Sequence, residues 1–193
     1  NRLLKSTPGR RVRVGGHFLR ADLPWLLSLG IDVREEYAPD PVDIKGGGWD
    51  TSLMIHAVNE TARFGLTDCA LRLTEAPRYD VKLEDWKKSY CAKNKIKAKD
   101  MEGYGECPAD ILCPDKRRLG EDNPSYGAYD ADVTRRIAMK YLRPGGKLDA
   151  DQFGNSCWEA YWRHHRVSLA VLEMEQTGFG MDLKRVDELM LVF

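Results

Sequence analysis

The segment 124–142 constrains the fold of this chain more than any other. It begins at an Asn-Pro pair, which is typical of a helix start, and it is followed by Pro-Gly-Gly, which ends a helix. Its apolar residues Val133, Ile137 and Tyr141 step by four, so they form one stripe on a helix. The sequence therefore predicts a long helix over 124–142 whose stripe packs against another element.

Two polar residues continue that stripe toward the start of the helix. Projected back, the same face carries Asp130 and then Tyr126, one turn apart. A carboxylate on an inward face is costly unless it is paired or binds a metal ion. The spacing leaves two interpretations open: Asp130 lies solvated at the edge of the stripe, or it takes part in a site.

Shorter elements are expected around this helix. Val12 and Val14 alternate with arginines and are followed by two glycines, which predicts a strand. Two stretches are predicted to be loops. Residues 33–48 are acidic and then contain Pro and Gly, and residues 93–123 are rich in Lys, Asp, Gly and Pro. Caps, apolar spacing and glycine stops predict helices over 22–30, 51–64, 83–92 and 158–177, one starting at Thr67 and one opening at Asp182. Asp50 is the expected cap of the helix over 51–64.

Composition limits the function classes. The chain has 193 residues, 42% hydrophobic and 31% charged, as in an ordinary soluble globular protein of one domain and part of a second. It has no apolar run long enough to span a membrane and no secretion signal, so we expect a cytoplasmic protein without a membrane partner. The five cysteines fit no zinc or redox spacing. The net charge is zero, so any nucleic-acid contact must come from local patches.

The string Tyr126-Gly-Ala-Tyr-Asp-Ala-Asp-Val-Thr134 resembles a known motif. It is similar to the third exonuclease motif, Tyr-x-x-x-Asp, in the proofreading domain of family A (DNA polymerase I-like) DNA polymerases. Of the eight tyrosines in the chain, only Tyr126 has an aspartate four residues later. The resemblance implies that Asp130 is a metal ligand and that Tyr126 orients the attacking water.

The string Val14-Gly-Gly-His-Phe-Leu-Arg-Ala-Asp-Leu-Pro-Trp25 resembles the second exonuclease motif of the same family. Asp22 matches the family aspartate, and His17 matches a histidine common there, but Phe18 stands where the family has asparagine. The resemblance implies a metal-binding carboxylate at Asp22 and nucleic-acid contacts at His17 and Arg20. Taken alone, Asp22 reads as a helix N-cap.

The segment 167–189 resembles the junction at which family A enzymes pass into the polymerase domain, a helix ending in Met-Glu-x-x-Gly and restarting at Asp182. The resemblance implies an α/β, ribonuclease H-like 3′–5′ exonuclease fold over 1–148, with its first strands missing. It implies the α-helical start of the polymerase domain over 149–193. We therefore expect the chain to be a fragment of a bacterial or phage-encoded polymerase.

The family reaction hydrolyses the last phosphodiester of a DNA 3′ end with two divalent metal ions, Mg²⁺ or alternatively Mn²⁺. The expected partners are a single-stranded 3′ end and a primer-template, with dNTP used by the absent polymerase part. A first motif, Asp-x-Glu, should also supply ligands, and no acidic residue precedes Asp22. We therefore expect the fragment alone to be inactive.

Two other functions remain open. A degenerate, non-catalytic exonuclease domain would act as a structural support for the polymerase. A stand-alone RNase D-like 3′–5′ exoribonuclease would act on RNA, but it would not need the junction over 167–189.

Several further side chains are open to two interpretations. The lysines of 87–88 and 93–99 either contact phosphates or form solvated faces. We expect His164 and His165 on a solvated or DNA-facing basic edge. We expect Trp25 and Trp86 to be core or edge aromatics rather than base-stacking platforms.

Overall fold

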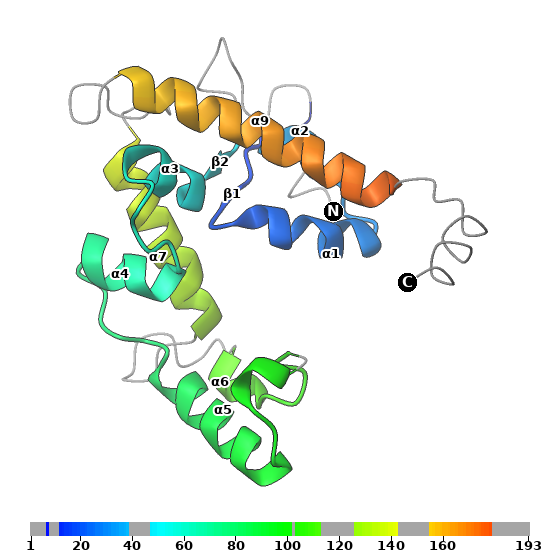
Figure 1. The fold of residues 1–193 in the computed structure, drawn as a ribbon, viewed down its shortest axis with the longest axis vertical. Coiled ribbons are helices and arrows are strands. Elements are labelled where there is room, and N and C mark those ends of the chain that lie inside the picture. The colour runs from blue at the N-terminus through cyan, green and yellow to red at the C-terminus, as the bar shows by residue number, and fades with distance from the viewer. Residues whose placement is uncertain are drawn as a thin grey trace, which may run out of the picture.

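Two long helices frame the computed structural model, which describes residues 7, 12–38, 47–101, 103–112, 126–142 and 155–178. Helix α7 spans Tyr126–Tyr141 and helix α9 spans Asn155–Thr177 (Figure 1). Val133 and Ile137 are fully buried and Tyr141 is nearly so, which confirms the inward stripe of α7. The expected helix over 158–177 is also confirmed, and it begins three residues earlier.

A short parallel sheet lies between these helices. Strand β1 (Gly15–Gly16) pairs with strand β2 (Trp49–Asp50), with Gly15 opposite Trp49 and Gly16 opposite Asp50. A Cβ at Gly15 would overlap the Trp49 ring, so the close strand approach requires glycine there. The expected strand over Val12 and Val14 is therefore shifted: the paired residues are the two glycines after it.

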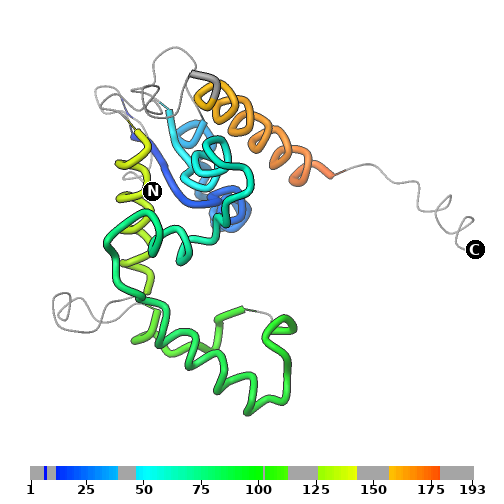
Figure 2. The backbone as a smooth tube through the Cα atoms, turned by 60° about the vertical axis from the view of Figure 1, so that its left-hand side comes forward, coloured from blue at the N-terminus to red at the C-terminus, as the bar shows by residue number. Residues whose placement is uncertain are grey.

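The remaining described elements are helices. Some lie around the sheet, and others form a lobe below it (Figures 1 and 2). They are η1 (Leu19–Ala21), α1 (Leu23–Ser28), α2 (Arg34–Tyr37), α3 (Thr51–Val58), α4 (Leu66–Leu73), α5 (Val81–Asn94), η2 (Ala98–Asp100) and α6 (Ala109–Leu112). None of these described helices has the length and apolar content that a membrane crossing needs.

Several predicted boundaries were wrong. The helix predicted over 51–64 ends at Val58 because Asn59 turns the chain: its side chain accepts hydrogen bonds from the Thr61 N–H and hydroxyl. The helix predicted over 83–92 runs longer, from Val81 to Asn94. The predicted loops contain α2, η2 and α6. The helix expected at Asp182 lies outside the described residues.

Two hydrophobic clusters form the core, and α9 contributes to both. One cluster gathers α3, α4 and α7 around Met54, Ile55, Cys69, Val133, Ile137 and Tyr161. The other gathers η1, α1 and α2 around Leu19, Leu23, Val33, Tyr37 and Leu172. Tyr161 and Leu172 both belong to α9. This helix therefore joins the two halves of the core.

The carboxylate of Asp50 lies between the clusters and is 1% exposed. It ends β2 and caps α3, as its sequence position predicts. It also accepts hydrogen bonds from other elements, and its donors are Phe18 N, Leu19 N, Tyr37 Oη, Ser52 N, Ser52 Oγ and Leu53 N, at 2.6 to 3.4 Å. A buried negative charge is tolerable only when it is hydrogen-bonded in this way.

A hydrogen-bonded chain connects Asp50 to α9. The Asp50 N–H donates to Tyr161 Oη at 3.1 Å, and Tyr161 Oη lies 3.1 Å from His165 Nδ1. His165 is fully buried and packs on the Tyr37 ring, with centroids 4.4 Å apart. Burial lowers the pKa of His165 to about 4, so its ring is neutral at neutral pH and shares one hydrogen bond with the Tyr161 hydroxyl.

The position of His165 corrects the expectation of a solvated or DNA-facing edge. That expectation failed because the aromatic partner of His165, Tyr37, is far from it in sequence. His164 is exposed, as expected. Trp25 is 74% exposed, so it is not a core residue.

Replacing Asp50 by alanine should destabilise the fold severely. The substitution leaves several buried N–H and O–H donors without an acceptor, at a cost of at least about 3 kcal/mol. Urea unfolding followed by circular dichroism measures this loss. The control is Asp68→Ala, on the exposed first turn of α4, which should change stability by less than about 0.5 kcal/mol. Equal stability of the two variants would contradict the role given to Asp50.

His165 should make the fold sensitive to acid. Because the pKa of His165 is lowered from 6.5 to about 4 on folding, protonation favours the unfolded chain. Its contribution to stability is complete above pH 6.5 and is lost as the pH falls toward 4, by up to about 3 kcal/mol. Urea unfolding at several pH values should show a shallower acid loss for His165→Gln than for the wild type. Parallel pH profiles would refute this assignment.

Candidate functional site

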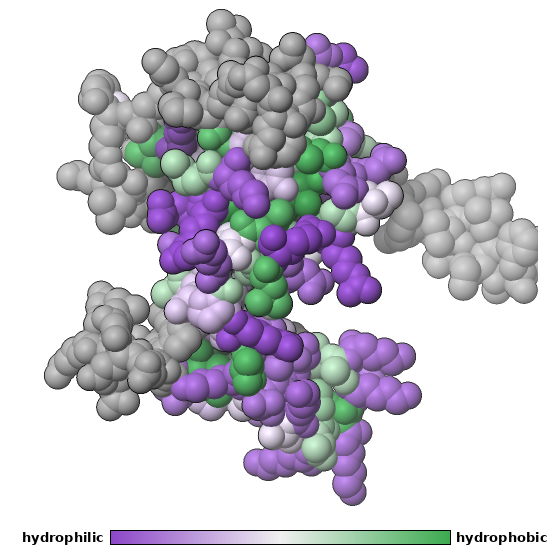
Figure 3. All heavy atoms as spheres, turned by 90° about the vertical axis from the view of Figure 1, so that its left-hand side faces the viewer, coloured by the Kyte–Doolittle hydropathy of each residue, from purple (hydrophilic) through white to green (hydrophobic). Residues whose placement is uncertain are grey.

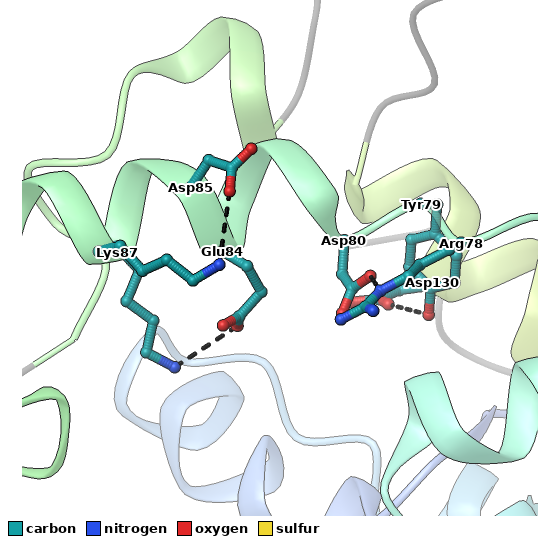
Figure 4. Close-up of polar contacts among 8 residues, drawn as sticks. Arg78, Tyr79, Asp80, Glu84, Asp85, Lys87 and Asp130 are labelled. Atoms are coloured by element: carbon teal, nitrogen blue, oxygen red, sulfur yellow. Dashed lines mark hydrogen bonds and ion pairs between the residues drawn. The ribbon is translucent and has the colours of Figure 1, made fainter.

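The N-terminal half of α7 carries the candidate site and lies against β1 and α4 (Figure 1). Asp130 is half-buried there and accepts a hydrogen bond from Tyr79 Oη at 2.8 Å (Figure 4). Tyr126, one turn before it, also donates a hydrogen bond to Asp130. Two tyrosine hydroxyls thus hold this carboxylate, and the interpretation in which Asp130 is merely solvated at the edge of the stripe is wrong.

The environment of Asp130 raises its pKa. Burial is the largest cause, and the negative charge of Asp80 adds to it. The hydrogen bonds from Tyr79 and Tyr126 and the proximity of His17 act in the opposite direction. The pKa values of both tyrosines are raised, chiefly by burial, so their hydroxyls keep their protons at neutral pH and act as donors.

Tyr79 was not among the residues predicted from the sequence. It follows α4 in the Arg78-Tyr79-Asp80 stretch, in which Arg78 pairs with Asp80 at 3.0 Å (Figure 4). The Tyr79 ring stacks on Tyr129 with centroids 5.3 Å apart. No motif marks a single tyrosine between two helices, so only the fold reveals that it reaches Asp130.

His17 is bonded within the protein on both sides of its ring. Nε2 lies 2.5 Å from the carbonyl oxygen of Phe64, and Nδ1 lies 2.8 Å from Thr51 Oγ1. A carbonyl only accepts, so Nε2 carries a proton. Burial lowers the pKa of His17, which favours a neutral ring. The Thr51 hydroxyl lies within hydrogen-bond distance of both His17 Nδ1, at 2.8 Å, and the carbonyl oxygen of Gly16, to which it donates at 3.2 Å. In this arrangement His17 positions β1, α3 and the loop before α4.

Arg20 also has a partner within the chain. Its guanidinium forms an ion pair with Glu175 of α9, and both side chains are partly exposed. The contact ties η1 to α9. Both His17 and Arg20 thus have partners within the protein. The nucleic-acid contacts expected at these two residues stay predictions.

Asp22 precedes α1, but its side chain makes no capping hydrogen bond. The simple N-cap interpretation of this residue is therefore wrong. The side chain is exposed, and its pKa is raised by partial burial and by the charge of Asp50. The described part of the chain contains no group of three or more side chains placed to hold a metal ion. Asp22 and Asp130 alone form no complete metal cage, although their hard carboxylate oxygens suit Mg²⁺.

Phe18 adopts a strained backbone conformation beside this site. Its φ of 57° and ψ of 40° are left-handed, and its ring is 52% exposed. The Phe18 N–H donates to Asp50 at 3.0 Å, which holds the turn in place. Asparagine tolerates this conformation better than phenylalanine does. Phenylalanine in place of the motif asparagine therefore costs backbone conformational energy, and its exposed ring gains little packing in return.

Comparison with known proteins gives one partial likeness. No protein-family model matches the chain, and no solved structure matches it. One stretch of the chain is similar to a phage DNA polymerase. Over 94 residues it is 33% identical to the DNA polymerase of Escherichia phage T5. The match covers 48% of this chain and 10% of that polymerase, so the chain corresponds to a small part of its relative.

Phe18→Asn should stabilise the fold. Asparagine relieves the left-handed strain by about 1 kcal/mol, and the exposed ring loses little packing. Thermal unfolding of the two proteins measures the difference. Phe64→Asn serves as the control because Phe64 is similarly exposed and has no positive φ, so it should gain nothing. A Phe18→Asn protein less stable than the wild type would show that the ring contributes more than the strain costs.

Proposed function

We propose that this chain is part of a DNA polymerase and carries the rear of its 3′–5′ proofreading exonuclease site. The observation that supports this most directly is Asp130, a half-buried carboxylate held by the hydroxyls of Tyr79 and Tyr126. The 94-residue similarity to the phage T5 polymerase supports the DNA polymerase part of the proposal. On this proposal the parent is a family A enzyme and the exonuclease part has a ribonuclease H-like fold.

The residues of α7 have distinct roles in the proposed reaction. Asp130 holds a divalent ion, Mg²⁺ or Mn²⁺, through hard carboxylate oxygens. Tyr79 orients that carboxylate through its 2.8 Å hydrogen bond. The Tyr126 hydroxyl keeps its proton at neutral pH because burial raises its pKa, and it can turn toward an attacking water. Asp22 contributes a second carboxylate.

Divalent ions held there would supply an activated water and positive charge for the leaving 3′ oxygen. The remaining ligands come from an Asp-x-Glu motif in the longer protein. On this proposal the substrate is the single-stranded 3′ end of DNA, and dNTP belongs to the polymerase part. The described helix α9 lies in the part assigned to the polymerase start, yet it packs on α3 and η1 and shares both core clusters.

A degenerate exonuclease domain that only supports the polymerase is the second candidate. Two observations favour it. Phe18 replaces the asparagine of the second motif in a strained turn, and the side chains of His17 and Arg20 are both committed to internal partners. In that case Asp130 is a helix residue whose hydrogen bonds serve packing alone.

The test uses the longer protein that contains this chain, in an assay of Mg²⁺-dependent nucleotide release from a 3′-mismatched primer. Asp130→Ala should reduce release by at least about 100-fold, because loss of a metal ligand exceeds the effect of disturbing its supporting shell. Asp132→Ala is the matched control: it lies half a turn away on α7 and pairs with Arg135 and Arg136. It should cleave like the wild type.

Two outcomes of that assay decide against the proposal. Equal release from Asp130→Ala and wild type would remove Asp130 from the site. No release from a folded parent that synthesises DNA would favour the structural support. The 193-residue chain given Mg²⁺ on its own should release no nucleotides, since no Asp-x-Glu precedes Asp22.

A further inference from the structure

A lower lobe, residues 81–101 and 103–112, projects away from the sheet and carries α5, η2 and α6 (Figures 1 and 2). Helix α6 contacts both α5 and α7, so the lobe is held next to the helix that bears Asp130. The proposed reaction uses no residue of this lobe. Its surface combines aromatic rings with lysines.

A row of aromatic rings leads from the lobe toward Asp130. Trp86 lies 5.1 Å from Tyr90 and 6.3 Å from Tyr104, measured between ring centroids. Tyr104 is 41% exposed. It lies within electrostatic reach of Tyr126, whose ring is 5.8 Å from that of Tyr79. The rings of the lobe therefore extend from its open surface to Tyr104, which is close enough to Tyr126 to raise the pKa of that tyrosine.

Lysines follow the same face of α5. Lys82, Trp86, Tyr90 and Lys93 step by three or four residues, so they share one stripe of the helix. Beyond the helix end the exposed side chains of Lys95, Lys97 and Lys99 continue the basic surface. Within the described residues, no ion pair joins Lys93, Lys95, Lys97 or Lys99 to a carboxylate.

The lysines on the other side of α5 differ. Lys87 pairs with Glu84 (Figure 4), and Lys88 pairs with Asp85, each at 3.6 Å. Their charges are therefore partly neutralised within the helix. The space-filling view shows hydrophilic side chains projecting from the lobe around hydrophobic ones (Figure 3). The positive charge that remains for a partner lies on the stripe with the aromatic rings.

A hollow of about 410 Å³ lies beside this stripe, lined by Tyr90, Ile96, Asp100, Met101, Gly103, Gly105 and Glu106. The carboxylates of Asp100 and Glu106 would repel phosphates there, so a phosphate backbone is favoured along the lysines instead. Base N–H groups, such as N3–H of thymine, are hydrogen-bond donors and can approach those carboxylates. The hollow thus separates a place for bases from a place for phosphates.

We propose that this face of the lower lobe binds single-stranded DNA and leads its 3′ end toward Asp130. Exposed aromatic rings next to a basic track are the features by which proteins hold single strands without sequence preference, the rings by stacking and the lysines by phosphate contact. A duplex hides its base faces and cannot stack on Tyr104. The direction toward Asp130 rests on the exonuclease function proposed above, whereas binding itself does not.

Fluorescence anisotropy of a labelled oligothymidylate, with the 193-residue chain in EDTA, tests the binding without any cleavage. Tyr104→Ala should bind about 5- to 150-fold more weakly, since it loses a stacked base, and Tyr104→Phe should bind like the wild type. The double variant Lys93→Gln, Lys97→Gln should lower the slope of log K against log salt by about 1.4. Lys88→Gln, on the other side of α5 and paired with Asp85, is the control and should change binding least.

The proposal is overturned if Tyr104→Ala and the double lysine variant bind as the wild type does, or if Lys88→Gln weakens binding as much as they do. Tighter binding of a duplex than of the single strand would also overturn it. The lysine variants are exposed substitutions, so they decide the question even if Tyr104→Ala lowers helix content. If the longer protein binds DNA through this face but has no nuclease activity, the exonuclease proposal is rejected and the binding surface stands.

Discussion

The buried carboxylate of Asp50 accepts hydrogen bonds from three parts of the chain and holds them together. Its donors come from the turn after β1, from α2 and from the first turn of α3, and its own N–H reaches α9 through Tyr161. Charge-assisted hydrogen bonds of this kind are roughly twice as strong as neutral ones. Elements that are distant in the sequence therefore meet at one side chain.

The same carboxylate determines the geometry of the candidate site. By accepting the N–H groups of Phe18 and Leu19 it fixes the turn that places His17 against Thr51 and directs the chain into α1 at Asp22. The left-handed conformation of Phe18 follows from this requirement. Backbone strain is tolerated where the surrounding structure over-determines a residue, and functional sites are where it concentrates.

Three aspartates of the chain have different environments. Asp50 is saturated by donors and has no capacity left for a ligand. Asp130 accepts from two tyrosines and retains further lone pairs in a half-buried position that raises its pKa. Asp22 makes no capping bond at all. Motif similarity named Asp22 and Asp130, and the hydrogen-bond counts distinguish them from Asp50 independently.

Local patterns predicted the parts of this fold that depend on local forces. The stripe of Val133 and Ile137 foretold the inner face of α7, and the position of Asp50 foretold its capping of α3. The early end of α3 depends on the side chain of Asn59, which accepts a hydrogen bond from the Thr61 N–H. The apolar spacing continues past Asn59, so the sequence predicted a longer helix. Three features were missed because they depend on partners distant in the sequence. Tyr79 bonds Asp130, which is 51 residues away, and Tyr161 bonds Asp50, which is 111 residues away. His165 is buried against Tyr37 of α2.

Anomalous diffraction can show whether Asp130 belongs to a metal-dependent nuclease site. The measurement uses crystals of the longer protein, including its first motif, soaked with Mn²⁺ and a single-stranded oligonucleotide. We expect an anomalous peak within coordination distance of Asp130, about 2.0 to 2.2 Å, with Tyr79 still hydrogen-bonded to the same carboxylate. A bound 3′ end with no peak near Asp130 would contradict a metal-binding role for Asp130.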